Sequence, residues 1–490
     1  MTPSDWLSRG ASLLRPTLET KATAASGSAA HAGAQDAPVA PAAHPRSTRE
    51  RLKATLRRRQ EALSPRVLRR TLTELQAIID PQVSEVEGGR RAKALSVWYA
   101  QASAEERRDC WLLMSEQFAP DANKLKAVRE LYEAAQGTAE EGQAEIRMRK
   151  ALVSPRTRLL QRFAVFPEGM RFLVDLRAEL LPHLKGDKRL VALDAELESL
   201  FSTWFDVAFL ELRRISWDSP ASLIEKLIKY EAVHDIRSWA DVKNRLDSDR
   251  RCYGFFHPRL DGEPLIFVEV ALIDEIATCI TPLLDEAAAP SDLVKATTAI
   301  FYSISSTQAG LRGVSFGDSL IKHVVETLKG EFPKLKTFAT LSPLPGLRAW
   351  LTRNAGTLLE RLDSKSRAAL ARVLGTEPTA RELLAAWEQP LQDLDAKSPL
   401  RLMLLRGAAT YLGRELQDGK PIDPVARFHL GNGARIERLN WAGDPSAKGH
   451  RQSYGLMVNY LYDLKRLDKH RTLLAHGQVP VSGAIEDLYI

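Results

Sequence analysis

Residues 299–329, AIFYSISSTQAGLRGVSFGDSLIKHVVETLK, decide the fold class of this chain. The apolar, β-branched run 299–304 predicts a strand, and residues 318–329 have the spacing of an amphipathic helix. Between them, residues 310–317 form a glycine-rich turn that carries one arginine. Such a loop can hold a pyrophosphate, because glycines let backbone N–H groups approach an anion and the helix dipole favours its charge. The ligands predicted by this arrangement are nucleotides and coenzyme A.

The loop alone leaves two interpretations open. Its spacing is neither the dinucleotide pattern GxGxxG nor a P-loop, because no Lys-Ser/Thr pair follows the glycines. Two glycines in a strand–turn–helix connection also serve turn geometry without any ligand. The rest of the chain has to separate these interpretations.

Length and composition describe an ordinary globular protein. The 490 residues are enough for two to four domains, and 44% are hydrophobic and 27% charged. No apolar run is long enough to span a bilayer, and the N-terminus lacks the pattern of a secretory signal. The three cysteines, Cys110, Cys252 and Cys279, have no CxxC spacing, which favours a reducing compartment and disfavours structural zinc.

The positive net charge raises the question of nucleic-acid binding. The chain carries a formal charge of +7 and its pI is about 9.2. Its most basic segment, 49–59, starts at a capping box, Ser47-Thr48-Arg49-Glu50, which predicts a helix with a solvated basic face. No aromatic residues interleave with the arginines, as a base-stacking surface would require. We therefore expect an anionic small-molecule substrate and no nucleic acid.

The chain divides into three parts by composition. Residues 1–46 include an Ala/Pro/Ser/Gly-rich stretch that predicts a disordered tail. Residues 47–205 show helical periodicity throughout and predict a bundle. Residues 206–490 mix helices and strands, so the predicted fold is a two-domain α+β chain with an all-α first domain.

Within the third part, the expected elements follow local patterns. Helices are expected at 204–214 and 222–230, and a larger helical segment at about 356–415. Strands are expected at 252–257 and 265–271, joined as a hairpin at Asp261-Gly262. Further strands are expected at 336–341, 425–430 and 455–464, with a hairpin-like segment at 435–441.

A serine, a histidine and three tyrosines in this part are candidates for chemistry. Ser342 ends a strand ahead of Pro343-Leu344-Pro345-Gly346, but it does not form a GxSxG elbow, so a turn-capping role is its simpler interpretation. His429 is expected at a strand end, half-buried, where an imidazole with a near-neutral pKa can act as a general acid. A lone histidine on an apolar strand is more often a core residue. Tyr454, Tyr460 and Tyr462 are possible hydrogen-bond donors, although core packing is the simpler interpretation for at least two of them. No histidine has a metal-binding spacing such as HExxH.

Taken together, six segments of this chain resemble the malonyl-CoA decarboxylase family. They span nearly the whole of residues 206–490 and occur in the expected order, and the helical region before them has a similar layout. The segments are YEAVHDIRSWADVKNRLDSDRRCYGFFHP (230–258), GEPLIFVEVAL (262–272), FYSISSTQAGLRGVSFG (301–317), FPKLKTFATLSPLPGLRAWL (332–351), DPVARFHLGNGARIERLNWAGD (423–444) and GLMVNYLYDL (455–464).

The resemblance implies a specific organisation. The helical domain would mediate assembly, and residues 206–490 would adopt the CoA-dependent N-acyltransferase fold. Ser342 would be the proton acceptor and a substrate contact, His429 the proton donor, and Tyr462 a supporting donor. The segment implied to bind the pyrophosphate of CoA consists of Arg312, Gly313, Val314, Ser315, Phe316, Gly317 and Asp318.

The chemistry implied is the loss of CO2 from malonyl-CoA to give acetyl-CoA. The thioester carbonyl already accepts the electrons, so we expect no metal and no cofactor beyond the CoA of the substrate. The protein has to stabilise the enolate and protonate C2. Our hypothesis is that His429 protonates C2 while Ser342 contacts the malonyl carboxylate or carbonyl.

Assembly, location and two alternative functions complete the expectations. The family suggests a homotetramer built as a dimer of dimers, and Ala221 stands where a linking cysteine would be sought. The chain ends in Asp487-Leu488-Tyr489-Ile490, without a peroxisomal Ser-Lys-Leu signal, so we expect a cytoplasmic bacterial-type enzyme without membrane attachment. The alternatives are an acyltransferase using the same CoA site and a non-enzymatic scaffold that binds CoA or nucleic acid.

Overall fold

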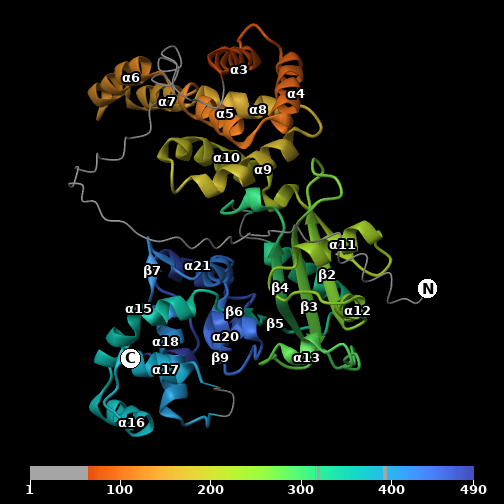
Figure 1. Cartoon of the computed structure of the whole chain (residues 1–490), viewed down its shortest axis with the longest axis vertical. Helices are drawn as coiled ribbons and strands as arrows, with labels where there is room; N and C mark the ends of the chain where they lie inside the picture. The colour runs from red at the N-terminus through yellow and green to blue at the C-terminus, as the bar shows by residue number, and fades with distance from the viewer. Residues whose placement is uncertain (1–63, 315, 317–319, 390–393, 490) are drawn as a thin grey trace, which may run out of the picture. The chain divides into compact units, whose positions relative to one another are not determined.

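The computed structural model describes residues 64–314, 316, 320–389 and 394–489 (Figure 1). The predicted tail and the basic helix at 47–63 lie outside the described residues. So do three residues of the predicted pyrophosphate segment, Ser315, Gly317 and Asp318.

The described residues 64–205 are mainly helical, as predicted. Several of the helices begin at side-chain caps that satisfy free backbone N–H groups: Ser64 caps α3, and Ser103 with Glu106 forms a capping box at α5. Short 3-10 turns lie at Leu181–His183 and Lys188–Leu190. The helices are α3 (Pro65–Ile78), α4 (Glu85–Gln101), α5 (Ala104–Glu116), α6 (Ala122–Ala135), α7 (Glu141–Leu152), α8 (Pro155–Phe163), α9 (Gly169–Leu180) and α10 (Val191–Trp204).

Two of these helices stand apart from the core. The helices α6 and α7 pack side by side, and α6 buries none of its residues (Figure 1). Leu131 on α6 remains 54% exposed and Ile146 on α7 remains 38% exposed. This helical hairpin therefore presents apolar side chains to its surroundings.

Residues after 205 build an eight-stranded mixed sheet in the order β1-β2-β3-β4-β5-β10-β6, with β9 also paired to β10. Only the β4–β5 pair is parallel, and the other pairs are antiparallel. The strands are β1 (Glu211–Ile215), β2 (Arg250–Phe256), β3 (Pro264–Ile273), β4 (Thr298–Ser306), β5 (Thr337–Thr340), β6 (Ser342–Pro343), β9 (Arg435–Asn440) and β10 (Met457–Leu461). A separate ribbon pairs β7 (Leu416–Gln417) with β8 (Lys420–Pro421).

The helices of this second part surround the sheet and form a further helical cluster at 347–413. Its boundaries agree broadly with the helical segment expected at about 356–415. The helices are α11 (Ala221–Tyr230), α12 (Trp239–Arg245), α13 (Thr281–Leu284), α14 (Leu320–Glu331), α15 (Leu347–Glu360), α16 (Ser364–Leu374), α17 (Ala380–Trp387), α18 (Pro399–Gly413), α19 (Pro424–Gly431), α20 (Ala447–Ser453), α21 (Leu467–Ala475) and α22 (Gly483–Glu486).

Most predicted strands are confirmed. The hairpin of β2 and β3 turns at Gly262, whose φ of 66° is in the region that favours glycine. The strand that opens the decisive stretch is β4, and the amphipathic helix after the glycine turn is α14. The helix expected at 204–214 is wrong. The side chain of Asp206 caps a short 3-10 turn (Val207–Phe209), and β1 then pairs with the edge of β2.

Candidate active site

The first element of the site is the end of β5. The parallel pairing of β4 with β5 extends to Phe301 and Thr340, and Ser342 follows directly in β6. Residues two apart in extended chain point to the same face, so Thr340 and Ser342 lie next to each other. The hydroxyl of Ser342 donates to Oγ1 of Thr340 at 2.8 Å. The same Oγ1 accepts the backbone N–H of Tyr460 at 3.1 Å, which anchors it to β10.

His429 comes from a helix, and the predicted strand at 425–430 is wrong. Asp423 accepts the N–H groups of Val425 and Ala426, and Pro424 occupies the first turn, so the chain starts α19 here. His429 lies in the last turn of that helix and is only 3% exposed, in place of the half-buried position expected.

The structure brings the three predicted catalytic residues together. Nε2 of His429 lies 3.3 Å from Oγ of Ser342, and Nδ1 lies 2.7 Å from the hydroxyl of Tyr462. The imidazole also stacks on the ring of Tyr460, with centroids 4.7 Å apart and an interplanar angle of 26°. Helix α19 and strand β10 thus hold the histidine in place.

The hydrogen-bond partners indicate which ring nitrogen of His429 carries the proton. The Ser342 hydroxyl donates to Thr340, so its oxygen accepts from N–H of Nε2. Nδ1 then accepts the O–H of Tyr462. We infer one directed chain of donors, running Tyr462 to His429 to Ser342 to Thr340.

Burial keeps the side chains of this hydrogen-bond chain uncharged. Desolvation lowers the pKa of His429 to about 3, so the near-neutral pKa expected from the sequence is wrong. Burial also raises the pKa of Tyr462 well above its ordinary value, which keeps its O–H protonated. At neutral pH the imidazole and the phenol are therefore both uncharged donors.

The loop predicted to bind pyrophosphate is described in part. A 3-10 turn at Ala309–Leu311 leads to Arg312, which is exposed, and to Gly313, whose φ is 82°. Only glycine adopts this left-handed conformation without strain. Val314 is buried and Phe316 is partly buried, so the exposed part of the described loop is its arginine and glycine.

Sequence reasoning missed Thr340 and Asn459. The amide nitrogen of Asn459 donates to the carbonyl of Thr340 at 2.7 Å and so fixes the strand end that carries Ser342. One signal was available for Thr340, because residue i−2 of a strand shares the face of residue i. No comparable local signal marks Asn459.

A second buried polar cluster lies elsewhere in the sheet, on β2, β3 and β4. Glu269 is opposite Cys252 in the register, and Cys252 packs against Leu227 of α11. Arg245 donates to Glu269 at 2.9 Å and to Asp241 at 2.7 Å. Burial raises the pKa of Glu269 to about 8, with a further contribution from nearby Glu231.

Glu231 completes this cluster. Its carboxylate accepts the hydroxyls of Ser303 and Ser305 and the backbone N–H groups of Val233 and His234. The two serine bonds tie the end of α11 to β4. We therefore interpret this cluster as a structural one that joins α11 to the sheet.

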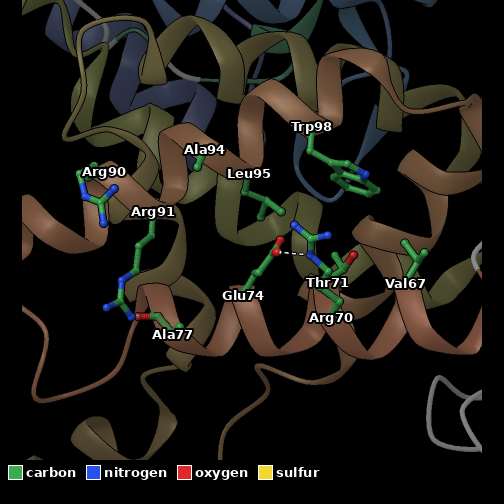
Figure 2. Close-up of a pocket in the computed structure, with 10 residues that line it drawn as sticks. All are labelled: Val67, Arg70, Thr71, Glu74, Ala77, Arg90, Arg91, Ala94, Leu95 and Trp98. Carbon is green, nitrogen blue, oxygen red and sulfur yellow. Dashed lines mark hydrogen bonds and ion pairs between the residues drawn. The ribbon is translucent and has the colours of Figure 1, made fainter.

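A cavity of about 510 Å³ lies between α3 and α4 (Figure 2). Figure 2 shows three arginine side chains around it, and Arg70 pairs with Glu74 at 2.7 Å. None of the predicted site residues lines it. The lining residues are Val67, Arg70, Thr71, Glu74, Ala77, Arg90, Arg91, Ala94, Leu95 and Trp98.

Comparison with known proteins identifies the family. The family model described as malonyl-CoA decarboxylase C-terminal domain matches residues 208–489, more than half of the chain. The chain belongs to the malonyl-CoA decarboxylase family. The corresponding N-terminal domain model of malonyl-CoA decarboxylase matches residues 118–205.

Individual members of the malonyl-CoA decarboxylase family agree with this assignment. The mitochondrial malonyl-CoA decarboxylase of Anser anser anser is 38% identical over 344 residues, which are 66% of this chain and 67% of that protein. The mitochondrial enzyme of Mus musculus is 35% identical over 407 residues, covering 77% of this chain and 80% of its own.

Solved structures of malonyl-CoA decarboxylases share the fold. The enzyme from Rhodopseudomonas palustris has 40% identity and a TM-score of 0.73, covering 88% of this chain and 100% of that chain. The enzyme from Cupriavidus metallidurans has 42% identity and a TM-score of 0.70, covering 86% and 100%. The fold class that the resemblance implied, a helical region followed by a mixed α/β region, is confirmed.

Proposed function

We propose that this chain converts malonyl-CoA to acetyl-CoA and CO2 at the site formed by Ser342, His429 and Tyr462. One observation carries the proposal: residues from β6, α19 and the end of β10 meet in a buried, directed chain of hydrogen bonds. The family to which the chain belongs supports the same reaction. The CoA moiety of the substrate would bind at Arg312–Asp318, and no further cofactor is required.

The proposed reaction begins with cleavage of the bond between C2 and the carboxylate. The electron pair moves into the thioester, giving CO2 and an enolate. The burial of Ser342 and His429 supports this step, because a site that excludes water weakens the hydration of the carboxylate. The Ser342 hydroxyl would turn from Thr340 to contact the malonyl carboxylate or carbonyl and donate to the enolate oxygen. In the resting site its oxygen would be the accepting partner of Nε2 of His429.

Protonation of C2 completes the proposed reaction. The neutral His429 would donate its Nε2 proton to C2, forming the new C–H bond of acetyl-CoA. The Tyr462 hydroxyl would then donate toward Nδ1 and stabilise the negative charge left on the ring. A proton from solvent restores the resting chain, so the reaction consumes one proton and releases one CO2.

The proposed CoA site rests on the exposed Arg312 and the left-handed Gly313. Arg312 offers a guanidinium to a phosphate, and Gly313 allows the backbone to approach it. Both residues lie between β4 and α14, where the sequence pattern predicted an anion.

The test is incubation of the purified chain with malonyl-CoA and no acceptor. Acetyl-CoA and CO2 formed in equal amounts are the expected result. Malonyl-CoA that is consumed only after an amine is added would instead support an acyltransferase on the same site. Binding to DNA with a steep salt dependence, and no turnover, would support a non-enzymatic scaffold.

We also propose that the chain assembles into a homotetramer through its helical part, as a dimer of dimers. The exposed apolar side chains of the α6–α7 hairpin support this proposal, because a second copy would cover Leu131 and Ile146. Leu131→Glu should reduce the mass measured by light scattering, whereas Val373→Glu, at an apolar side chain 49% exposed on α16, should not. An unchanged mass in both variants would exclude this hairpin.

A cytoplasmic location is the last part of the proposal. All three cysteines are free thiols in the structure, which suits a reducing compartment. Among the described helices, none combines the length and the apolar character that crossing a bilayer requires. Fractionation of cells that express the full chain is the direct measurement.

A further inference from the structure

The first observation concerns Arg177, an arginine of α9 that is only 1% exposed. Its Nη1 donates to the carbonyl of Gly310 at 2.8 Å and to the carbonyl of Arg312 at 2.9 Å. Its Nε donates to Asp194 of α10 at 2.8 Å. One buried side chain of the helical region thus holds two carbonyls of a loop more than 130 residues later in the chain.

The second observation is the close approach of the same helix and the same loop. A Cβ atom on Gly310 would lie 1.9 Å from the carbonyl oxygen of Val174, so any side chain there would force the backbone apart. A second arginine of α9, Arg171, donates to Gln308 at 2.6 Å. The loop is therefore seated directly on α9.

A third contact joins the helical region to the loop on the far side of the glycine turn. The backbone N–H of Val207, just after α10, donates to the carbonyl of Phe316 at 3.0 Å. The carbonyls of residues 310, 312 and 316 thus all accept hydrogen bonds from residues 177–207.

The geometry of the peptide unit determines, from these hydrogen bonds, which way the N–H of Gly313 points. In a trans peptide unit the C=O and the following N–H point opposite ways, and no cis peptide occurs in the described chain. Because the carbonyl of Arg312 points to Arg177, the N–H of Gly313 points away from the helical region. This orientation leaves the N–H of Gly313 free to donate to an anion bound on the outer side of the loop.

We propose that Arg177 is a positioning residue for coenzyme A binding, and that the helical region thereby forms part of the substrate site. The proposal rests on the proposed function for the identity of the ligand. Arg177 does not touch the ligand. It holds the peptide units at 310–313 in the orientation that presents Gly313 and the side chain of Arg312 to the pyrophosphate.

Ion pairing shows that Arg177 acts through its hydrogen bonds. Asp194 pairs with it at 2.8 Å, and Glu198 lies 3.7 Å away, so its positive charge is compensated inside the helical region. A longer-range attraction between this guanidinium and a phosphate is correspondingly weak. The variant Arg177→Lys would keep the charge but would lose the planar guanidinium whose fixed donors meet the two carbonyls and Asp194 together.

The chain offers a matched control in Arg156. This arginine of α8 is 4% exposed and donates to three backbone carbonyls, those of Met114, Ser115 and Ala192. Two of these carbonyls belong to α5 and the third to α10, and none of them lies in the loop. Arg156→Met therefore reproduces the loss of a buried arginine without disturbing the CoA loop.

The experiment compares Arg177→Met and Arg156→Met in the full chain. We measure kcat and KM for malonyl-CoA, Kd for CoA by calorimetry, and Tm. Arg177→Met should raise KM and Kd about tenfold with kcat nearly unchanged, because preorganisation of the loop is lost before the chemical step. Arg156→Met should lower Tm without changing KM or Kd. Arg177→Lys, which is milder, should raise Kd in the same direction if Arg177→Met does not fold.

Two results would overturn the inference. One is an unchanged KM and Kd in folded Arg177→Met and Arg177→Lys. The other is an equal rise in Kd in the Arg156 control, which would indicate a general loss of stability. If the wild-type chain does not decarboxylate malonyl-CoA, the proposed function fails separately, because Kd for CoA is measured without turnover.

Discussion

Two regions of the sheet carry two different buried polar clusters. One contains Ser342, His429 and Tyr462, which are uncharged and linked in a single directed chain. The other contains Glu269 and Arg245 with further carboxylates, and it is a network of charges. Both clusters have shifted pKa values, so the shifts alone do not separate a reactive site from a structural one.

The cause of each shift does separate them. Desolvation alone lowers the pKa of His429, with no contribution from a charged neighbour. In the Glu269 cluster, burial raises the pKa while Arg245 opposes the rise by pairing with the carboxylate. The charge of Arg245 is therefore compensated by carboxyl groups within the fold. The uncharged residues Ser342, His429 and Tyr462 have no such internal counter-charge, so their hydrogen bonds are available to a charged ligand.

The largest expected effect would test the structural role of the charged cluster. Arg245→Met leaves the buried acidic side chains of Glu269 and Asp241 without their partner, and removing one partner of a buried ion pair typically costs about 3–5 kcal/mol of folding free energy. Urea unfolding should show this loss. The folded fraction should keep the wild-type kcat, and a large fall in kcat at full folding would show that catalysis had been assigned to the wrong cluster.

The next effect concerns the neutral chain. His429→Ala and Ser342→Ala should each lower kcat by about 10²–10³ or more, the usual result of removing a preorganised donor at a developing oxyanion. Release of CO2 from malonyl-CoA gives the rate, and circular dichroism checks folding. Near-normal release by either folded variant would remove that residue from the mechanism.

A smaller effect is expected at Thr340, which orients the Ser342 hydroxyl. Thr340→Val keeps the shape but removes the acceptor, so the hydroxyl is free to turn toward His429 and compete with the donor at Nε2. We expect kcat to fall about tenfold, in line with one misdirected hydrogen bond. Thr340→Ser should restore most of the rate, and KM should stay constant. A rise in KM with kcat unchanged would contradict this role.

The last prediction concerns the pH dependence of stability. The pKa of His429 is about 3 in the folded chain and 6.5 ordinarily, so the stability linked to its neutral form is fully present above about pH 6.5. That stability is lost as the pH falls from 6.5 toward 3. His429→Gln should therefore lose less stability than the wild type over this range in urea unfolding. A step in the wild-type kcat near pH 6.5 would show that His429 titrates normally.

Much of the fold could be predicted from local patterns. The strand, glycine turn and helix around residues 299–329 follow from β-branched runs, positive-φ glycine and apolar spacing. The misassigned segment at 425–430 shows the limit. A short apolar run fits a strand or a buried helix equally, and the deciding signal was Asp423-Pro424, which caps the helix.

The site was predictable only in part. Ser342, His429 and Tyr462 were found through family-like segments, and the structure brings them together. The direction of their hydrogen bonds depends on Thr340 and on burial, neither of which a linear pattern contains. The role of Arg177 is harder to predict from the sequence, because the two loop carbonyls that it binds lie more than 130 residues further along the chain.

The seat of the loop on α9 also bears on how this chain can be recombined. The match to two family domains, ending at 205 and beginning at 208, suggests parts that could be exchanged between relatives. The pair Gly310 and Val174 and the reach of Arg177 cross that boundary. In a chimera joined at this boundary, the loop keeps its position only if both parent proteins have the same residues at these three positions. Crossover points for such chimeras should therefore be chosen from the contacts and not from the domain limits.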